Sequence, residues 1–131
     1  MTNQINTLLI IGGFYNLIFA VIHLTLPKVC KWKEDIAKLT LVNRGMFQVF
    51  SILVTLYLFF LAYVSLFHTQ ELIDTSLGHM IIAFIALGWT IRAVSQIFIY
   101  GVKELASIAL TIVFFAGTII YLIPMIQILT K

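Results

Sequence analysis

The chain of 131 residues is 62% hydrophobic and 10% charged, with a formal net charge of +3. A soluble domain carries about a quarter charged residues, so this composition excludes water as the solvent for most of the surface. The few basic residues lie beside apolar segments, which excludes a nucleic-acid-binding face and is typical of membrane orientation and lipid contact. The single cysteine, Cys30, excludes an internal disulfide and a Cys-x-x-Cys motif.

Four apolar segments of membrane-spanning length occupy most of the chain. They cover about residues 7–26, 45–67, 77–100 and 105–129. A helix rises about 1.5 Å per residue, so about 20 apolar residues cross a hydrocarbon core of about 30 Å. Short connections force neighbouring spans to run antiparallel. The sequence therefore predicts one all-α domain over residues 1–131, a polytopic membrane protein folded as an antiparallel up-down-up-down four-helix transmembrane bundle.

The connection between the first two spans has the pattern of a short interfacial helix, at about residues 28–40. Its apolar residues recur at helical spacing, and Trp32 among them is suited to anchor the helix at the membrane surface. Lys31 and Lys33 are expected to lie at the level of the lipid headgroups. The alternative for this segment is an ordinary solvated linker.

Helix boundaries are marked by residues with known preferences for helix ends. Pro27 is expected to end the first span and to open the interfacial helix. Asn43 is expected to cap the second span, and Ser76 or Asp74 the third. These signals place the helix ends near the limits of the apolar segments.

Basic residues are concentrated in the connections on one side of the membrane. The third connection has Lys103, and the first has five basic residues: Lys28, Lys31, Lys33, Lys38 and Arg44. The second connection holds Glu71 and Asp74, and Lys131 ends the chain on that same side. The positive-inside rule then places the first and third connections in the cytoplasm and both termini outside. A bacterial inner membrane is the expected location.

Strongly polar side chains within the spans gather in the half of the membrane that faces the basic connections. His23, Gln48 and Gln96 each lie about four residues from that end of their spans, about 6 Å deep. Arg92 lies one turn deeper, and its long side chain can reach the same level. Three further candidates lie nearer the middle of the membrane or at its rim: Asn16, Asn43 and Arg44. Together these residues are expected to form one polar pocket.

Arg92 is the strongest of these signals. A cation at that depth costs several kcal/mol unless it has a partner. All five acidic residues lie in connections or at their edges, so the spans encode no counter-charge. Arg92 must therefore contact helix carbonyls, neutral polar side chains, a lipid phosphate or the acid group of a ligand. The alternative is that Arg92 extends to the headgroups and that His23 is a hydrogen-bonded packing residue.

The residue types narrow the function classes. A proton-coupled multidrug pump of four spans typically needs a buried carboxylate, and the spans of this chain hold none. The sequence also has no pair of carboxylates suited to a glycosidase and no convincing Ser-His-Asp triad. The sequence therefore favours a non-enzymatic membrane protein. Its pocket is expected to bind a lipid headgroup, a quinone-like molecule or another anionic or polar ligand. The alternatives are a subunit of a larger membrane complex and a homo-oligomer.

A cofactor-bearing protein is the other class left open. One haem b could be held by His23, with Arg44 or Arg92 meeting its propionates. His68 and His79 flank the second connection, and with a nearby carboxylate they could hold a divalent metal such as zinc or copper.

Several motifs are spread over most of the chain: His23-x3-Pro27-Lys28, Trp32-Lys33-Glu34-Asp35-Ile36-Ala37-Lys38-Leu39, Leu41-x-Asn43-Arg44 with Phe47, and Trp89-x2-Arg92-x3-Gln96. Together they resemble a group of small four-span bacterial integral membrane proteins of unassigned function. The resemblance implies one shared site formed by six residues: His23, Trp32, Asn43, Arg44, Arg92 and Gln96. It implies no reaction, ligand or partner.

Overall fold

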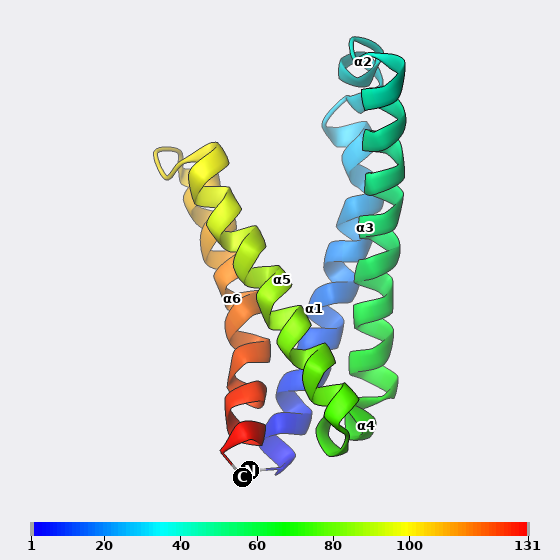
Figure 1. The fold of residues 1–131 in the computed structure, drawn as a ribbon. Coiled ribbons are helices and arrows are strands. Elements are labelled where there is room, and N and C mark those ends of the chain that lie inside the picture. Colours follow the sequence, from blue (N-terminus) through cyan, green and yellow to red (C-terminus); the bar gives the residue numbers. More distant parts are fainter. Residues whose placement is uncertain (1, 131) are drawn as a thin grey trace.

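Helices account for almost all of the chain that the structure describes. The computed structural model describes residues 2–130, and Lys131 lies outside the described residues. Its helices are α1 (Thr2–Val29), α2 (Trp32–Ala37), α3 (Leu41–Phe67), α4 (Thr69–Asp74), α5 (Ser76–Tyr100) and α6 (Leu105–Leu129) (Figure 1). Four of them, α1, α3, α5 and α6, are long and apolar enough to cross a membrane. The predicted all-α fold with four spans is confirmed.

The first connection differs from its predicted form. Pro27 lies inside α1, which continues to Val29, so the prediction that Pro27 ends the first span was wrong. Within the last turn of a helix, proline removes only one backbone hydrogen bond. The chain turns instead at Lys31, whose φ of 51° is left-handed and interrupts helical geometry. The short helix predicted over 28–40 is therefore reduced to the six residues of α2.

Threonines, rather than the predicted residues, cap the second and third spans. The Thr40 hydroxyl accepts from the backbone amide of Asn43 at 3.4 Å, and the Thr75 hydroxyl accepts from that of Gly78 at 2.9 Å. The predicted caps were wrong, because Asn43 lies inside α3, Ser76 is the first helical residue of α5 and Asp74 is the last residue of α4. The short helix α4 was not predicted either, because its residues read as a polar loop.

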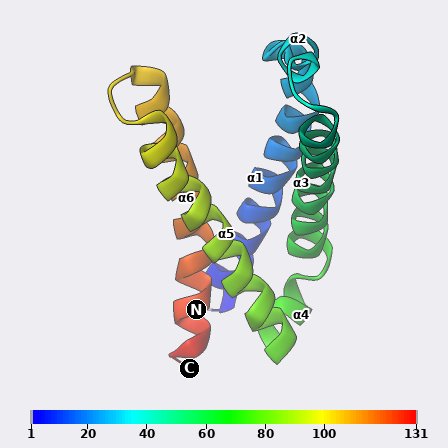
Figure 2. The same cartoon turned by 45° about the horizontal axis from the view of Figure 1, so that its top comes forward.

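The four long helices form two antiparallel hairpins. α1 packs along α3, α5 packs along α6, and the hairpins join chiefly through α1 and α6. Figure 1 shows that they meet near the chain termini and diverge toward α2 and the connection at 101–104. Figure 2 shows the same divergence from another side. The bundle is therefore V-shaped, with a closed end at the termini and an open end at α2.

The buried core lies at the closed end of the V. Leu9, Leu61 and Ile82 are buried there, and α4 adds Leu72 and Ile73. By contrast, α3 has no buried residue between positions 41 and 57. Apolar packing thus holds the two hairpins together at the closed end. At the open end the hairpins are separated by a space that their side chains line.

Candidate functional site

A buried polar cluster joins all four long helices where the V closes. Asn16 of α1 donates from Nδ2 to the Tyr121 hydroxyl of α6 at 2.6 Å, and also to its own helix at the Gly12 carbonyl, at 3.0 Å. The Tyr121 hydroxyl also hydrogen-bonds Ser65 of α3 at 2.8 Å, and Trp89 of α5 donates from Nε1 to Asn16 Oδ1 at 3.2 Å. We call these residues (Asn16, Ser65, Trp89 and Tyr121) the junction cluster. It fixes the relative position of the four helices.

Aromatic rings cover the junction cluster on its open side. Tyr15, Phe19 and Trp89 lie with ring centres 4.8–5.0 Å apart, and Phe114 lies 5.7 Å from Phe19. Gly117 lets them approach, because a Cβ there would lie 2.8 Å from Tyr15 and 2.9 Å from Trp89. These rings separate the junction cluster from the space above it.

Above the rings lies a cavity of about 370 Å³ between the hairpins. All four long helices contribute to its lining, which is mostly aliphatic and aromatic. We call it the hairpin cavity, and its lining residues are Phe19, Ile22, His23, Leu26, Val54, Tyr57, Leu58, Gly88, Trp89, Arg92, Leu110 and Phe114.

Arg92 and His23 bring polar groups to the hairpin cavity from opposite hairpins. The Arg92 guanidinium lies 4.1 Å from the centre of the Phe114 ring, which gives it a cation–π contact. Within residues 2–130, no carboxylate lies within ion-pair distance of Arg92. The His23 ring Nδ1 hydrogen-bonds the Thr55 hydroxyl at 3.1 Å, which orients the imidazole. The cavity thus combines a cation without an acidic partner, an oriented imidazole and apolar walls.

The structure places the residues from the first connection in a different pocket. Arg44 and Gln48 line an opening of about 810 Å³ beneath α2, together with Trp32 and Lys33. We call it the α2 groove. Trp32 packs its ring against Phe47, with ring centres 4.8 Å apart. Gln48 therefore lies away from Arg92, although the sequence placed both at one depth.

The remaining predicted residues lie outside both pockets. Gln96 is buried between α5 and α6, where its Nε2 donates to the Ser107 hydroxyl at 3.2 Å. Asn16 belongs to the junction cluster. Asn43 and Lys31 are exposed. Of the residues expected to share one site, His23 and Arg92 line the hairpin cavity, whereas Arg44 and Gln48 line the α2 groove. Trp32 lies beside both groups, because it lines the groove and its ring centre is 6.4 Å from that of His23.

His68 and His79 flank α4 at the closed end and have separate partners. His68 hydrogen-bonds Glu71 and the Tyr63 hydroxyl, both at 3.3 Å, and His79 hydrogen-bonds the Ile73 carbonyl at 2.7 Å. Hydrogen bonds from its own backbone amide and from His68 hold the pKa of the Glu71 carboxyl below its usual value. Among the described residues, no three His, Cys, Asp or Glu side chains are grouped as metal ligands.

Trp89, Phe114 and Ser65 were not among the predicted site residues, although Trp89 stands in one of the motifs quoted above. Trp89 and Phe114 wall the hairpin cavity, and Ser65 completes the junction cluster. Trp89 precedes Arg92 by three residues, so helical spacing put both on one face and was a usable signal. Ser65 offered no such signal, because single hydroxyl residues are common between membrane helices.

Comparisons with protein-family models, curated proteins and solved structures found no match to this chain. The four-span architecture implied by the resemblance to small membrane proteins is present. The bacterial origin that it implies stays a prediction.

Proposed function

We propose that this small integral membrane protein is non-enzymatic and binds an amphiphilic molecule in the hairpin cavity. The observation that carries the proposal is Arg92, a cation that faces an apolar cavity and has no acidic partner within residues 2–130. A membrane-embedded charge is costly unless it is paired. An anionic or strongly polar group on a bound ligand would supply the partner for the Arg92 guanidinium.

The shape of the cavity favours a ligand with a polar head and an apolar body. Its volume of about 370 Å³ falls within the range of small-molecule sites. Arg92 offers several donors to a phosphate, carboxylate or carbonyl oxygen, and the His23 ring lies on the facing hairpin. Apolar side chains fill the rest of the lining and suit an acyl or isoprenoid chain. A lipid headgroup and a quinone-like head share this chemistry.

Replacing Arg92 with leucine is expected to reduce the retained ligand roughly 10- to 100-fold. Charge-assisted hydrogen bonds contribute about 1.5–3 kcal/mol, and about 1.4 kcal/mol is a tenfold change in affinity. Native mass spectrometry of the purified protein measures the bound molecule, and its mass separates a lipid from a quinone. The Arg92→Lys variant keeps the charge and should retain more ligand than Arg92→Leu.

Equal retention by wild type and a correctly folded Arg92→Leu variant would contradict the proposal. An absorbance spectrum of the same samples tests the haem alternative, because haem gives a Soret band. No geometry described above favours haem or a metal, so neither is proposed as the ligand.

We further propose that α2 and the connection at 101–104 face the cytoplasm and that both termini lie outside. The first connection carries five basic residues, and the second carries Glu71 and Asp74, which is the asymmetry of the positive-inside rule. In a bacterial inner membrane, the hairpin cavity would then open toward the cytoplasmic half of the bilayer.

Cys30 provides a direct test of this orientation, because it is a free, exposed cysteine next to α2. A membrane-impermeant maleimide is expected to label it in inverted membrane vesicles and to leave it unlabelled in intact spheroplasts. The matched control carries Cys30→Ser with Ser76→Cys, which moves the thiol to an exposed position at the other end of the bundle. This control should show the opposite labelling, and labelling of Cys30 from outside would overturn the orientation.

A further inference from the structure

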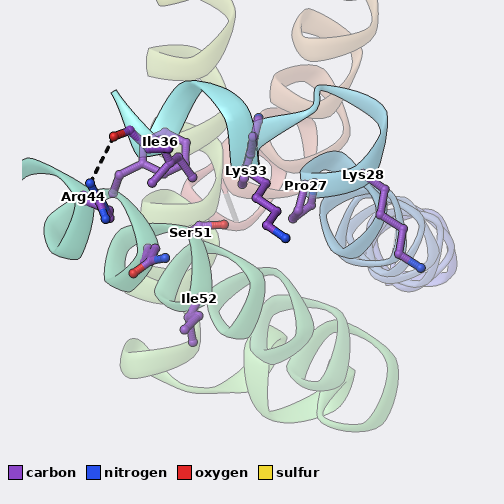
Figure 3. A pocket seen from close by; sticks show the side chains of 11 residues that line it. Pro27, Lys28, Lys33, Ile36, Arg44, Ser51 and Ile52 are labelled. Atoms are coloured by element: carbon purple, nitrogen blue, oxygen red, sulfur yellow. Dashed lines mark hydrogen bonds between the residues drawn. The ribbon is translucent and has the colours of Figure 1, made fainter. Parts of the chain in front are cut away.

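The α2 groove is a second pocket, on a different part of the surface from the hairpin cavity. It lies where α2 folds over the ends of α1 and α3, and its volume is about 810 Å³. Figure 3 shows that the labelled side chains around it come from all three helices. The two pockets have no lining residue in common.

Three cations surround the α2 groove. Lys28 comes from α1, Lys33 from α2 and Arg44 from α3. The acidic residues of α2 do not line it, and Asp35 is paired with Lys38 at 3.1 Å. Within residues 2–130, neither Lys28 nor Lys33 forms an ion pair. The groove therefore has a net positive lining that complements an anion.

Arg44 is held in place by α2. Its Nη2 donates to the carbonyl of Ala37, the last residue of α2, at 3.1 Å and to that of Leu39, just beyond α2, at 3.2 Å; Figure 3 marks the first of these bonds. Its Nε is buried and has no hydrogen-bond partner within residues 2–130. Because Nε is closed to solvent, an anion in the groove would be bound by the outer N–H groups of the guanidinium.

An apolar furrow continues from the groove along the seam between α1 and α3. The furrow has a volume of about 330 Å³, and it shares Pro27, Ser51 and Ile52 with the groove. Beyond these shared residues, aliphatic and aromatic side chains line most of it, including Leu56 and Phe59. A charged head region thus leads into an apolar channel that runs along the spans.

We propose that the α2 groove and this furrow bind one anionic phospholipid from the leaflet on the α2 side. Its anionic headgroup lies among the cations that line the groove, and one acyl chain lies in the furrow. Trp32 sits beside the head region, which is the position that tryptophan favours at the membrane interface. This lipid is distinct from the ligand of the hairpin cavity, and His23 forms part of the wall of both the furrow and that cavity.

The charge part of the proposal is tested by native mass spectrometry of protein titrated with phosphatidylglycerol or phosphatidylcholine. Wild type is expected to retain one phosphatidylglycerol in preference to phosphatidylcholine. The double variant Lys28→Gln with Lys33→Gln should lose that preference by roughly 10- to 30-fold, since each basic residue near an anionic surface contributes about a fivefold factor. The control, Lys31→Gln with Lys38→Gln, makes the same charge change outside the groove lining and should keep the preference.

The furrow part is tested by filling it with a larger side chain. Ile52→Trp is expected to reduce lipid retention at least fivefold, whereas Leu53→Trp, on an adjacent exposed position of α3, should not. Equal loss of the phosphatidylglycerol preference in both lysine double variants overturns the proposal, because binding would then come from general surface charge. Full lipid retention by Ile52→Trp also overturns it, because binding would then come from the phosphate alone. Arg92→Leu should leave this lipid bound, so failure here is distinguishable from failure of the hairpin cavity.

Discussion

Replacing Asn16 with leucine is expected to lower the free energy of unfolding by roughly 1–3 kcal/mol. The variant loses the hydrogen bonds between helices that Asn16 makes with Tyr121 and Trp89. Hydrogen bonds between membrane helices average about 0.6 kcal/mol and reach about 1.7 kcal/mol. The buried Trp89 Nε1 also loses its only partner among the described residues. Leucine has the same branching and number of side-chain heavy atoms as asparagine, so the change removes the polar groups without leaving a cavity.

Reversible unfolding in mixed detergent micelles measures this loss. Thr25→Val is the matched control on α1, because the Thr25 hydroxyl is exposed and, among the described residues, bonds only the Ile22 carbonyl of its own helix. The control should unfold like wild type. If Asn16→Leu unfolds at the same denaturant concentration as wild type, the junction cluster does not hold the hairpins together.

Replacing Gly12 with alanine is expected to have a second large effect, a loss of about 1–3 kcal/mol of stability from overpacking. A Cβ at Gly12 would lie 2.5–2.8 Å from three atoms of the Tyr121 side chain. That ring is fully buried, and its hydroxyl is bonded to Asn16 and Ser65, so it has little room to move away. We therefore expect α1 and α6 to be pushed apart.

Gly45→Ala is the control for backbone effects, because a Cβ at Gly45 meets nothing within 4 Å. Alanine is favoured over glycine in helices by up to about 1 kcal/mol, so this variant should unfold no earlier than wild type. Similar stabilities for Gly12→Ala and Gly45→Ala would contradict the close contact between α1 and α6.

The spans were predictable because a run of about 20 apolar residues has few other solutions. The helix ends were less predictable, because polar ends outside the hydrocarbon continue the helix as readily as they stop it. Thus α3 starts at Leu41 and α1 runs through Pro27 to Val29. The left-handed turn at Lys31 carries no sequence signal, since lysine has no special preference for that geometry.

The site was predictable only in part, for a geometric reason. Counting residues along a span gives an expected depth in the membrane, and His23 and Arg92, which were expected at similar depths, both line the hairpin cavity. Depth does not give the angle between hairpins. Because the hairpins diverge toward α2, Gln48 lines a separate groove, while Gln96 is buried within the second hairpin.

The most direct test of ligand binding in the hairpin cavity is an experimental structure of the protein in a lipid nanodisc. We predict density for a bound molecule between the hairpins, with a polar or acidic group within about 4 Å of the Arg92 guanidinium, as a charge-assisted contact requires. An Arg92 side chain that points outward among acyl chains, with side chains filling the space beside His23, would contradict it.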